Sequence, residues 1–261
     1  TRLSMAGLLF DCYYGVSGDM IVGALLDLGA DHLRLKRVLD SLHLHGYDIE
    51  ISKVDKKGIY ATDFLVKLDT ENHDHDMSYL YGKADEKVEI RSTRNLPTIC
   101  ALIDRADMTD KAKAIAKDIF TLVAKAESKA HKIDLDEVIF HETGAMDSII
   151  DIVSIAVLYD SLNIDAVYVA NLREGIGQIR TRVGMLPIPT PSVKNVLDMY
   201  NITISRAECN VELITPTGIS ALAVLSNFKQ LKEHKNFIKT GYGAGKREYA
   251  WPCVLRVSVF E

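Results

Sequence analysis

The feature that most constrains the fold is a helical segment over residues 148–162 that is apolar on most of its sides. A helix with an apolar surface nearly all round is a buried helix, because it has little polar face to turn to water. Two further helical patterns, over residues 98–106 and 110–131, precede it. We therefore predict that these helices supply much of the hydrophobic core.

Strand patterns stand on both sides of these helices. Residues 47–54 and 59–68 alternate between apolar and polar positions, and a turn at Lys57 and Gly58 joins them, which predicts a β-hairpin. The sequence therefore favours a mixed α/β (α+β) class, with mixed sheet layers packed with helices. The other predicted strands cover residues 7–10, 166–172, 183–186, 203–207, 237–241 and 253–260; the other predicted helices cover residues 20–28 and 33–42 or begin after Thr190 and Thr217.

The chain divides into three predicted stretches. Residues 1–70 form a strand, two helices and the hairpin, and residues 71–95 lose all regular pattern in a long His- and acid-rich loop. Residues 96–261 continue with a helical and then an α/β segment. This last stretch either stands alone or forms one continuous domain with residues 1–70.

Composition excludes several classes of protein. The formal net charge of −5 provides no general basic field for a nucleic acid. No stretch reaches the roughly 18 continuous apolar residues of a membrane span. The four cysteines lie far apart, form no zinc-type pair, and suit a reducing compartment, so we expect a cytoplasmic protein.

The first candidate site is the loop at residues 11–20. A strand ends at Asp11, two glycines follow, and a helix begins near Ser17, Gly18 and Asp19. Backbone N–H groups at such a helix start bind anions. Capping of the helix by Ser17 or Asp19 is the alternative. Asp11 is the more suggestive residue, because ligands of open α/β sheets gather at the carboxyl ends of strands.

Two segments offer metal ligands. His73 and His75 alternate in an extended stretch, so both imidazoles could approach one nickel, copper or zinc ion, or could be solvated loop residues. In residues 140–151, His141 and Glu142 precede a helix on which Asp147 and Asp151 lie one turn apart. Asp151 stands in an apolar run and needs a cation, a donor or a metal, so we favour a metal or acid/base site over a structural salt bridge.

Three later segments are turns. The prolines of residues 186–191 force an extended backbone that leads into a helix beginning near Pro191, which is a structural role. Residues 212–218 pass from a strand to a helix start, where Thr215, Thr217 and Gly218 either cap the helix or cradle a phosphate. In residues 241–248, Gly241 and Gly243 precede two cations, Lys246 and Arg247, which makes an anion contact plausible without a dinucleotide fingerprint.

These segments, in this order, resemble the nickel-insertion protein family of lactate racemase maturation, the pyridinium-3,5-bisthiocarboxylic acid mononucleotide nickel chelatases. The resemblance covers roughly residues 8–259 and includes the motifs at residues 17–20, 140–151, 186–189, 213–218 and 241–245. It implies a CTP-dependent enzyme of the lyase class that inserts nickel into a dithiolated pyridinium mononucleotide, with manganese or magnesium.

The resemblance also implies partners. Family members continue into a carboxyl-terminal domain associated with the nucleotide and with oligomerisation, and this sequence stops where that domain would begin. We therefore expect an oligomer, CTP binding through that domain or subunit, and a lactate racemase-type enzyme as recipient of the product.

Within this resemblance, His73 and His75 would collect nickel, while His141 and Glu142 hold or relay it. Asp147, Asp151 or Asp11 would place a divalent ion or accept the proton displaced from the pyridinium carbon. The turns named above would grip phosphate and carboxylates. Two rival interpretations are a non-catalytic nickel carrier and a metal-dependent phosphate-ester or nucleotide hydrolase.

Overall fold

The main sheet is mixed and has the strand order β2-β3-β9-β10-β1-β4 in the computed structural model, which describes residues 6–68, 95–138, 146–181 and 184–261. Strand β1 (Gly7–Asp11) is parallel to β4 (Ala166–Ala170) and antiparallel to β10 (Val254–Phe260). Strand β9 (Phe237–Ala244) is antiparallel to β10 and parallel to β3 (Ile59–Leu68). The mixed α/β class is confirmed, and strands from both sides of residues 69–94 share one sheet.

The predicted hairpin is confirmed. Strand β2 (Tyr47–Lys56) pairs antiparallel with β3, and Lys57 and Gly58 form the two-residue turn. Both turn residues have positive φ, +58° and +90°, as the tight turns that match the twist of a hairpin require. The carboxylate of Asp55 accepts a hydrogen bond from the Gly58 N–H at 2.6 Å and closes the turn.

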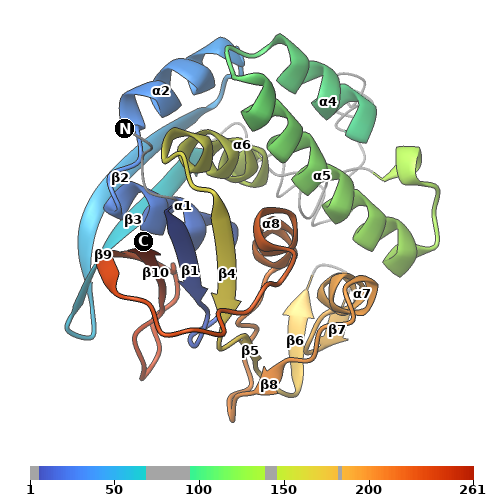
Figure 1. Ribbon diagram of the computed structural model, residues 1–261. Coiled ribbons are helices and arrows are strands. Elements are labelled where there is room, and N and C mark those ends of the chain that lie inside the picture. The colour runs from blue at the N-terminus through green and yellow to red at the C-terminus, as the bar shows by residue number, and fades with distance from the viewer. Residues whose placement is uncertain (1–5, 69–94, 139–145, 182–183) are drawn as a thin grey trace.

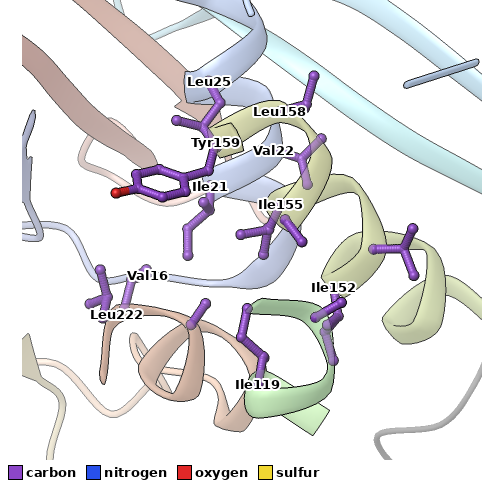
Figure 2. Packing of buried hydrophobic residues seen from close by; sticks show 14 of the residues in the cluster. Val16, Ile21, Val22, Leu25, Ile119, Ile152, Ile155, Leu158, Tyr159 and Leu222 are labelled. Carbon is purple, nitrogen blue, oxygen red and sulfur yellow. The ribbon is translucent and has the colours of Figure 1, made fainter. Parts of the chain in front are cut away.

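The buried helix is α6 (Met146–Ser161), and it lies between other helices as its apolar surface requires. It contacts α1 (Gly18–Asp27) on the side of the sheet and α5 (Asp110–His131) on the other side (Figure 1). Figure 2 shows Ile152 and Ile155 of α6 among Ile21 of α1, Ile119 of α5 and Leu222 of α8 (Pro216–Ser226). The prediction that these helices build the core is confirmed.

The remaining elements surround this core (Figure 1). They are α2 (His32–Ser41), α4 (Leu96–Arg105), the short 3-10 helix η2 (Leu135–Glu137), α7 (Pro191–Met199), and the short strands β5 (Arg173–Glu174), β6 (Gln178–Thr181), β7 (Gly184–Pro187) and β8 (Ser205–Arg206). Helix α7 begins at Pro191 as predicted.

Several predicted strands differ from the structure in extent or in the sheet to which they belong, and strand β4 ends at Ala170 and not at residue 172. Within residues 203–207, only the two residues of β8 form a strand, and β8 pairs with β5. Strand β7 pairs with β6 in another two-stranded sheet, so neither β7 nor β8 belongs to the main sheet. Strand β9 runs to Ala244, beyond the predicted end at residue 241. It continues because Gly241 and Gly243 pair with Val257 and Leu255 of β10, so glycines that look like a turn in the sequence are part of the ladder.

Candidate functional site

Three helices begin close together at the carboxyl end of strand β1. The loop between β1 and α1 runs beside the segment that leads into α8, because Val16 donates to the Leu213 carbonyl at 2.8 Å and Thr215 donates to the Val16 carbonyl at 3.0 Å. Helix α6 also begins here, and Asp151 in its second turn reaches the start of α1. We call this meeting point of α1, α6 and α8 the helix junction.

Glycines make the helix junction close-packed. A Cβ atom on Gly18 would lie 2.9 Å from Thr217 Cγ2 and 3.2 Å from Asp151 Oδ2. A Cβ atom on Gly218 would lie 2.6 Å from the Val16 carbonyl oxygen. Only residues without a side chain let the three helix starts approach this closely. Gly18, predicted as an anion-binding residue, therefore also determines how near the Asp151 carboxylate comes to α1, and Gly218 determines how near α8 comes to the loop at Val16 and Ser17.

Asp151 has the most unusual environment in the helix junction. Its Oδ1 is shielded from solvent and has no hydrogen-bond partner in the described part of the chain, although the residue as a whole is only half-buried. Burial raises the pKa of Asp151 well above the usual aspartate range. The neighbouring carboxylates of Asp19 and Asp147 raise this pKa further, and the Lys246 ammonium opposes them.

Asp19 connects this carboxylate to a lysine. Lys246 Nζ lies 3.4 Å from Asp19 Oδ2, contacts the Asp63 carboxylate, and donates to the Phe64 carbonyl at 2.6 Å. The Asp19 Oδ1 accepts hydrogen bonds from the Ser17 hydroxyl and from the Met20 N–H. The site therefore holds an acidic group on each side of one cation. Nothing in the sequence pattern of β3 pointed to Asp63.

The hydroxyl residues at the helix starts behave differently from one another. Thr215 caps α8 by accepting a hydrogen bond from the Gly218 N–H at 3.1 Å, so the capping alternative holds for this residue. Ser17 occupies the N-cap position of α1, but its side chain accepts no cap hydrogen bond and donates to Asp19 instead. Thr217 is buried beside Gly18.

Gly241 and Gly243 lie in strand β9 under helix α1. A Cβ atom on Gly243 would come 1.8 Å from the Met20 carbonyl oxygen, and one on Gly241 would come 2.6 Å from the Ala24 carbonyl oxygen. These two glycines lie in a strand and not in a turn, and helix α1 occupies the space beside them; the anion contact predicted for residues 241–247 stays a prediction. They seat α1 on the sheet and so bring Asp19 towards Lys246.

Arg247 belongs to a neighbouring group of charges that the sequence did not reveal. A hydrogen bond with Tyr249 raises the Arg247 pKa, and the Glu212 carboxylate lies near enough to raise it further. Burial raises the pKa of Glu212 to about 7; Glu174 adds to this rise and Arg247 opposes it. Glu174 is fully buried and accepts from the N–H groups of Gly175 and Leu213, at 2.8 and 2.7 Å.

Asp11 lies at the end of β1 and lines a pocket to which Asp19 and Asp151 do not contribute. It forms an ion pair with Arg256 of β10, accepts from Asn171 Nδ2 at 3.1 Å, and accepts from the Tyr13 N–H at 3.3 Å. The structure thus separates Asp11 from the Asp19 and Asp151 carboxylates, with the loop at residues 12–17 between them. The pocket beside Asp11 has a volume of about 270 Å³.

Comparison with known proteins identifies the family. The model of the family described as nickel insertion protein matches residues 8–261. This chain belongs to the nickel insertion protein family. A protein from Alkaliphilus metalliredigens named pyridinium-3,5-bisthiocarboxylic acid mononucleotide nickel insertion protein is 40% identical over 257 residues, which are 97% of this chain and 60% of that relative.

Two further relatives are also named as nickel insertion proteins. The protein of the same name from Lactiplantibacillus plantarum is 37% identical over 98% of this chain and 62% of its own length. A putative nickel insertion protein from Dictyoglomus thermophilum is 36% identical over 98% of this chain and 61% of its own length. The chain thus spans about 60% of the length of these relatives. No solved structure matches it significantly.

Several of the predicted nickel ligands lie outside the described residues; these are His73, His75, His141 and Glu142. Within the described ranges, no group of three or more His, Cys, Asp or Glu side chains is arranged to hold a metal ion. His131 pairs with Glu127 one turn earlier on α5, at 3.2 Å. Among the described helices, none combines the length and apolarity that crossing a bilayer requires.

Proposed function

We propose that this chain acts in nickel insertion into pyridinium-3,5-bisthiocarboxylic acid mononucleotide, as a CTP-dependent nickel chelatase of the lyase class, and that the helix junction is where its own residues act on the substrate. The single observation that carries the proposal is the Asp151 carboxylate, with a raised pKa and a shielded oxygen that has no partner among the described residues, in a chain of the nickel insertion family. A carboxylate held this way is suited to receive a proton or a cation.

The chemistry needs a proton acceptor at one carbon. When nickel bonds to a pyridinium ring carbon, the C–H bond breaks, its electron pair forms the nickel–carbon bond, and a proton leaves. The two thiocarboxylate sulfurs bind nickel as anions and need no further base. We assign the proton to Asp151, because its raised pKa gives it more affinity for a proton than an ordinary aspartate has.

Asp19 and Lys246 would prepare this step. Lys246 lies between the Asp19 and Asp63 carboxylates, and its positive charge opposes the rise that Asp19 and Asp147 cause in the pKa of Asp151. The N–H groups at the starts of α1 and α8, beside Ser17 and Thr217, give the junction partial positive charge for the anionic groups of the substrate.

Nickel itself is the substrate that is delivered. We propose that His73 and His75 collect the ion and that His141 and Glu142, which immediately precede α6 in the sequence, pass it to the junction, with Asp147 on the first turn of α6 as a further oxygen ligand. Asp11 pairs with Arg256, so we give it a binding role and not the role of base.

CTP, with manganese or magnesium, would supply the activation of the substrate when bound. We assign it to a carboxyl-terminal domain or subunit, because the described residues gather no set of three acidic or histidine ligands for such an ion. The product would pass to a lactate racemase-type enzyme, and an oligomer would join the two domains. A cytoplasmic location would suit the free cysteines at positions 12, 100, 209 and 253.

The test is product formation. The purified chain is incubated with nickel, CTP, manganese and the dithiolated mononucleotide, with and without a separately expressed carboxyl-terminal domain of a relative, and nickel-bearing product is measured by mass spectrometry. We expect Asp151→Asn, and the double variant His141→Ala, Glu142→Ala, to lose roughly 100-fold or more of the rate. Asp118→Asn, which changes an exposed aspartate of α5, is the matched control and should keep full rate.

Two outcomes would overturn the proposal. Nickel binding without product in every mixture would favour the carrier interpretation, and metal-dependent release of phosphate or pyrophosphate in the absence of the dithiolated mononucleotide would favour a hydrolase. Wild-type rate in Asp151→Asn would remove Asp151 from the mechanism even if the activity itself is found.

A further inference from the structure

The pocket beside Asp11 opens on the face of the sheet opposite helix α1. Gly241 and Gly243 point towards α1, so Tyr242 between them points to the other face. Asp11 and Arg256 are register partners and lie on that same face. The lining residues are Asp11, Tyr13, Tyr14, Ile59, Asn171, Tyr242, Val254 and Arg256. The proposed function gives Asp11 a binding role but names no ligand for this pocket.

The wall of the pocket is aromatic. The rings of Tyr13 and Tyr14 meet edge to face, with centroids 5.0 Å apart and planes at 85°, and Tyr242 adds a third phenol. Ile59 and Val254 supply aliphatic surface. The volume of about 270 Å³ is near the lower end of the range for small-molecule sites, which runs from about 300 Å³ upwards. Such a wall suits one small planar ring.

The charges of the pocket suit a ligand with both signs. Asp11 and Arg256 form an ion pair, and Tyr242 also hydrogen-bonds the Arg256 side chain. A guanidinium carries five N–H donors, more than these two partners require, and Arg256 is 53% exposed. Arg173 lies 4.0 Å above the Tyr13 ring and adds a second cation beside the pocket. Tyrosine faces attract a cationic ring, while the arginines attract a phosphate.

We infer that this pocket binds a pyridinium mononucleotide, with the cationic ring against Tyr13 and Tyr14 and the phosphate on Arg256. The inference rests on the proposed function for the identity of the substrate. The pocket and the helix junction share one loop: Tyr13 and Tyr14 stand at its beginning, and Ser17 and Asp19 follow at its end. A mononucleotide held here lies at one end of the loop and the carboxylates lie at the other, so its ring has to leave the tyrosines before a ring carbon can lose its proton to Asp151.

Binding of a commercially available pyridinium mononucleotide tests the inference without nickel or CTP. The probe is nicotinic acid mononucleotide, titrated into the full chain by calorimetry, with uridine monophosphate as a ligand that keeps the phosphate but has a neutral ring. We expect the pyridinium probe to bind about tenfold more tightly than uridine monophosphate, which corresponds to about 1.4 kcal/mol of cation–π attraction to the tyrosines.

Variants separate the two parts of the pocket. Arg256→Gln should weaken both ligands by about tenfold or more, since it removes a charge-assisted hydrogen bond to phosphate. Tyr13→Leu should remove the preference for the pyridinium ring. The matched control is Arg37→Gln. Arg37 lies on helix α2, outside the pocket lining, and forms an exposed ion pair with Asp107, so this variant should bind both ligands like the wild type.

A second measurement keeps the inference testable if Arg256→Gln fails to fold. In the wild-type chain, the ring protons of Tyr13, Tyr14 and Tyr242 should shift on addition of the pyridinium probe in nuclear magnetic resonance spectra. Absence of binding, or binding that leaves these rings and the Arg256 variant unaffected, overturns the inference. If nickel-bearing product forms while the pocket binds nothing, only the pocket assignment fails; if the pocket binds the probe but no mixture gives product, the proposed function fails instead.

Discussion

Helix α6 carries two shielded aspartates that the structure treats in opposite ways. Asp160, near its carboxyl end, forms an ion pair with Arg34 of α2 and accepts a hydrogen bond from the Thr109 hydroxyl at 2.7 Å. Asp151, near its amino end, lies among Asp19 and Asp147 and leaves one oxygen without a partner in the described part of the chain.

The different partners of Asp160 and Asp151 show how a carboxylate with a structural role can be distinguished from one with a functional role. A partly buried ion pair with a second donor holds elements together, here α2, the start of α5, and α6. An unpartnered carboxylate costs free energy of folding and persists only where it has another use. The same substitution at the two positions should therefore have opposite consequences.

The largest expected effect is at Asp160. Asp160→Asn should lower the free energy of unfolding by about 2–4 kcal/mol, because it leaves the Arg34 guanidinium without its counter-charge in a site that is only 20% exposed. Urea denaturation measures this loss, with the exposed Asp118→Asn as control. A loss below about 0.5 kcal/mol, the range of ordinary surface substitutions, would contradict the structural role.

Gly18 tests how closely the helix junction is packed. Gly18→Ala should lower the free energy of unfolding by about 1–3 kcal/mol, because the added methyl group meets Thr217 Cγ2 and the Asp151 carboxylate. Denaturation of the double variant Gly18→Ala, Thr217→Ser is the decisive comparison, since it removes the Cγ2 atom in the closer contact. Recovery of part of the lost stability supports the geometry, whereas equal instability of the single and double variants argues against it.

Asp151 should respond to pH in the direction that its raised pKa dictates. The folded chain holds this proton more tightly than the unfolded chain, so the free energy of unfolding falls as pH rises from the ordinary aspartate value of 3.8 towards the raised value. Asp151→Asn removes that decline. Its melting temperature should match the wild type near pH 4 and exceed it near pH 8; a difference that is constant with pH would contradict a raised pKa.

The smallest expected effect is at Glu212. Its pKa is raised to about 7, so its contribution to the free energy of unfolding should fall as pH rises from about 4.5 to about 7, and Glu212→Gln should flatten that part of the stability profile. Glu248→Gln is the control of opposite sign, because the pKa of Glu248 is lowered by Lys56 and its contribution is lost as pH falls. Matching profiles for the two variants would contradict this prediction.

Much of the fold follows from local pattern. The apolar surface of α6 on most of its sides, the alternation of β2 and β3, and the Lys57–Gly58 turn each depend on neighbours in the sequence, so they can be predicted without the tertiary structure. The strand boundaries of β8 and β9 could not be predicted in this way, because hydrogen bonds to distant strands decide where a ladder ends.

The candidate site, like the fold, was predictable only in part from neighbouring residues in the sequence. The sequence marked Asp151 as a carboxylate in an apolar run and Asp11 as the end of a strand, and both marks concern the residue and its immediate neighbours. The separation of Asp11 from Asp151, the pairing of Asp19 with Lys246, and the presence of Asp63 and Glu212 all involve residues far apart in the chain. No local pattern carries that information.

By itself, the sequence determined the α/β class, the buried helix, the hairpin and the family of this chain, because periodicity and motifs are properties of short segments. Only the tertiary structure decided that glycines of β9 seat α1 on the sheet, that three helix starts meet around Asp151, and that Asp160 pairs with Arg34 while Asp151 Oδ1 has no partner within the described ranges. The physical reason is that burial and charge pairing depend on which distant surfaces meet, and that is settled by packing of the whole chain.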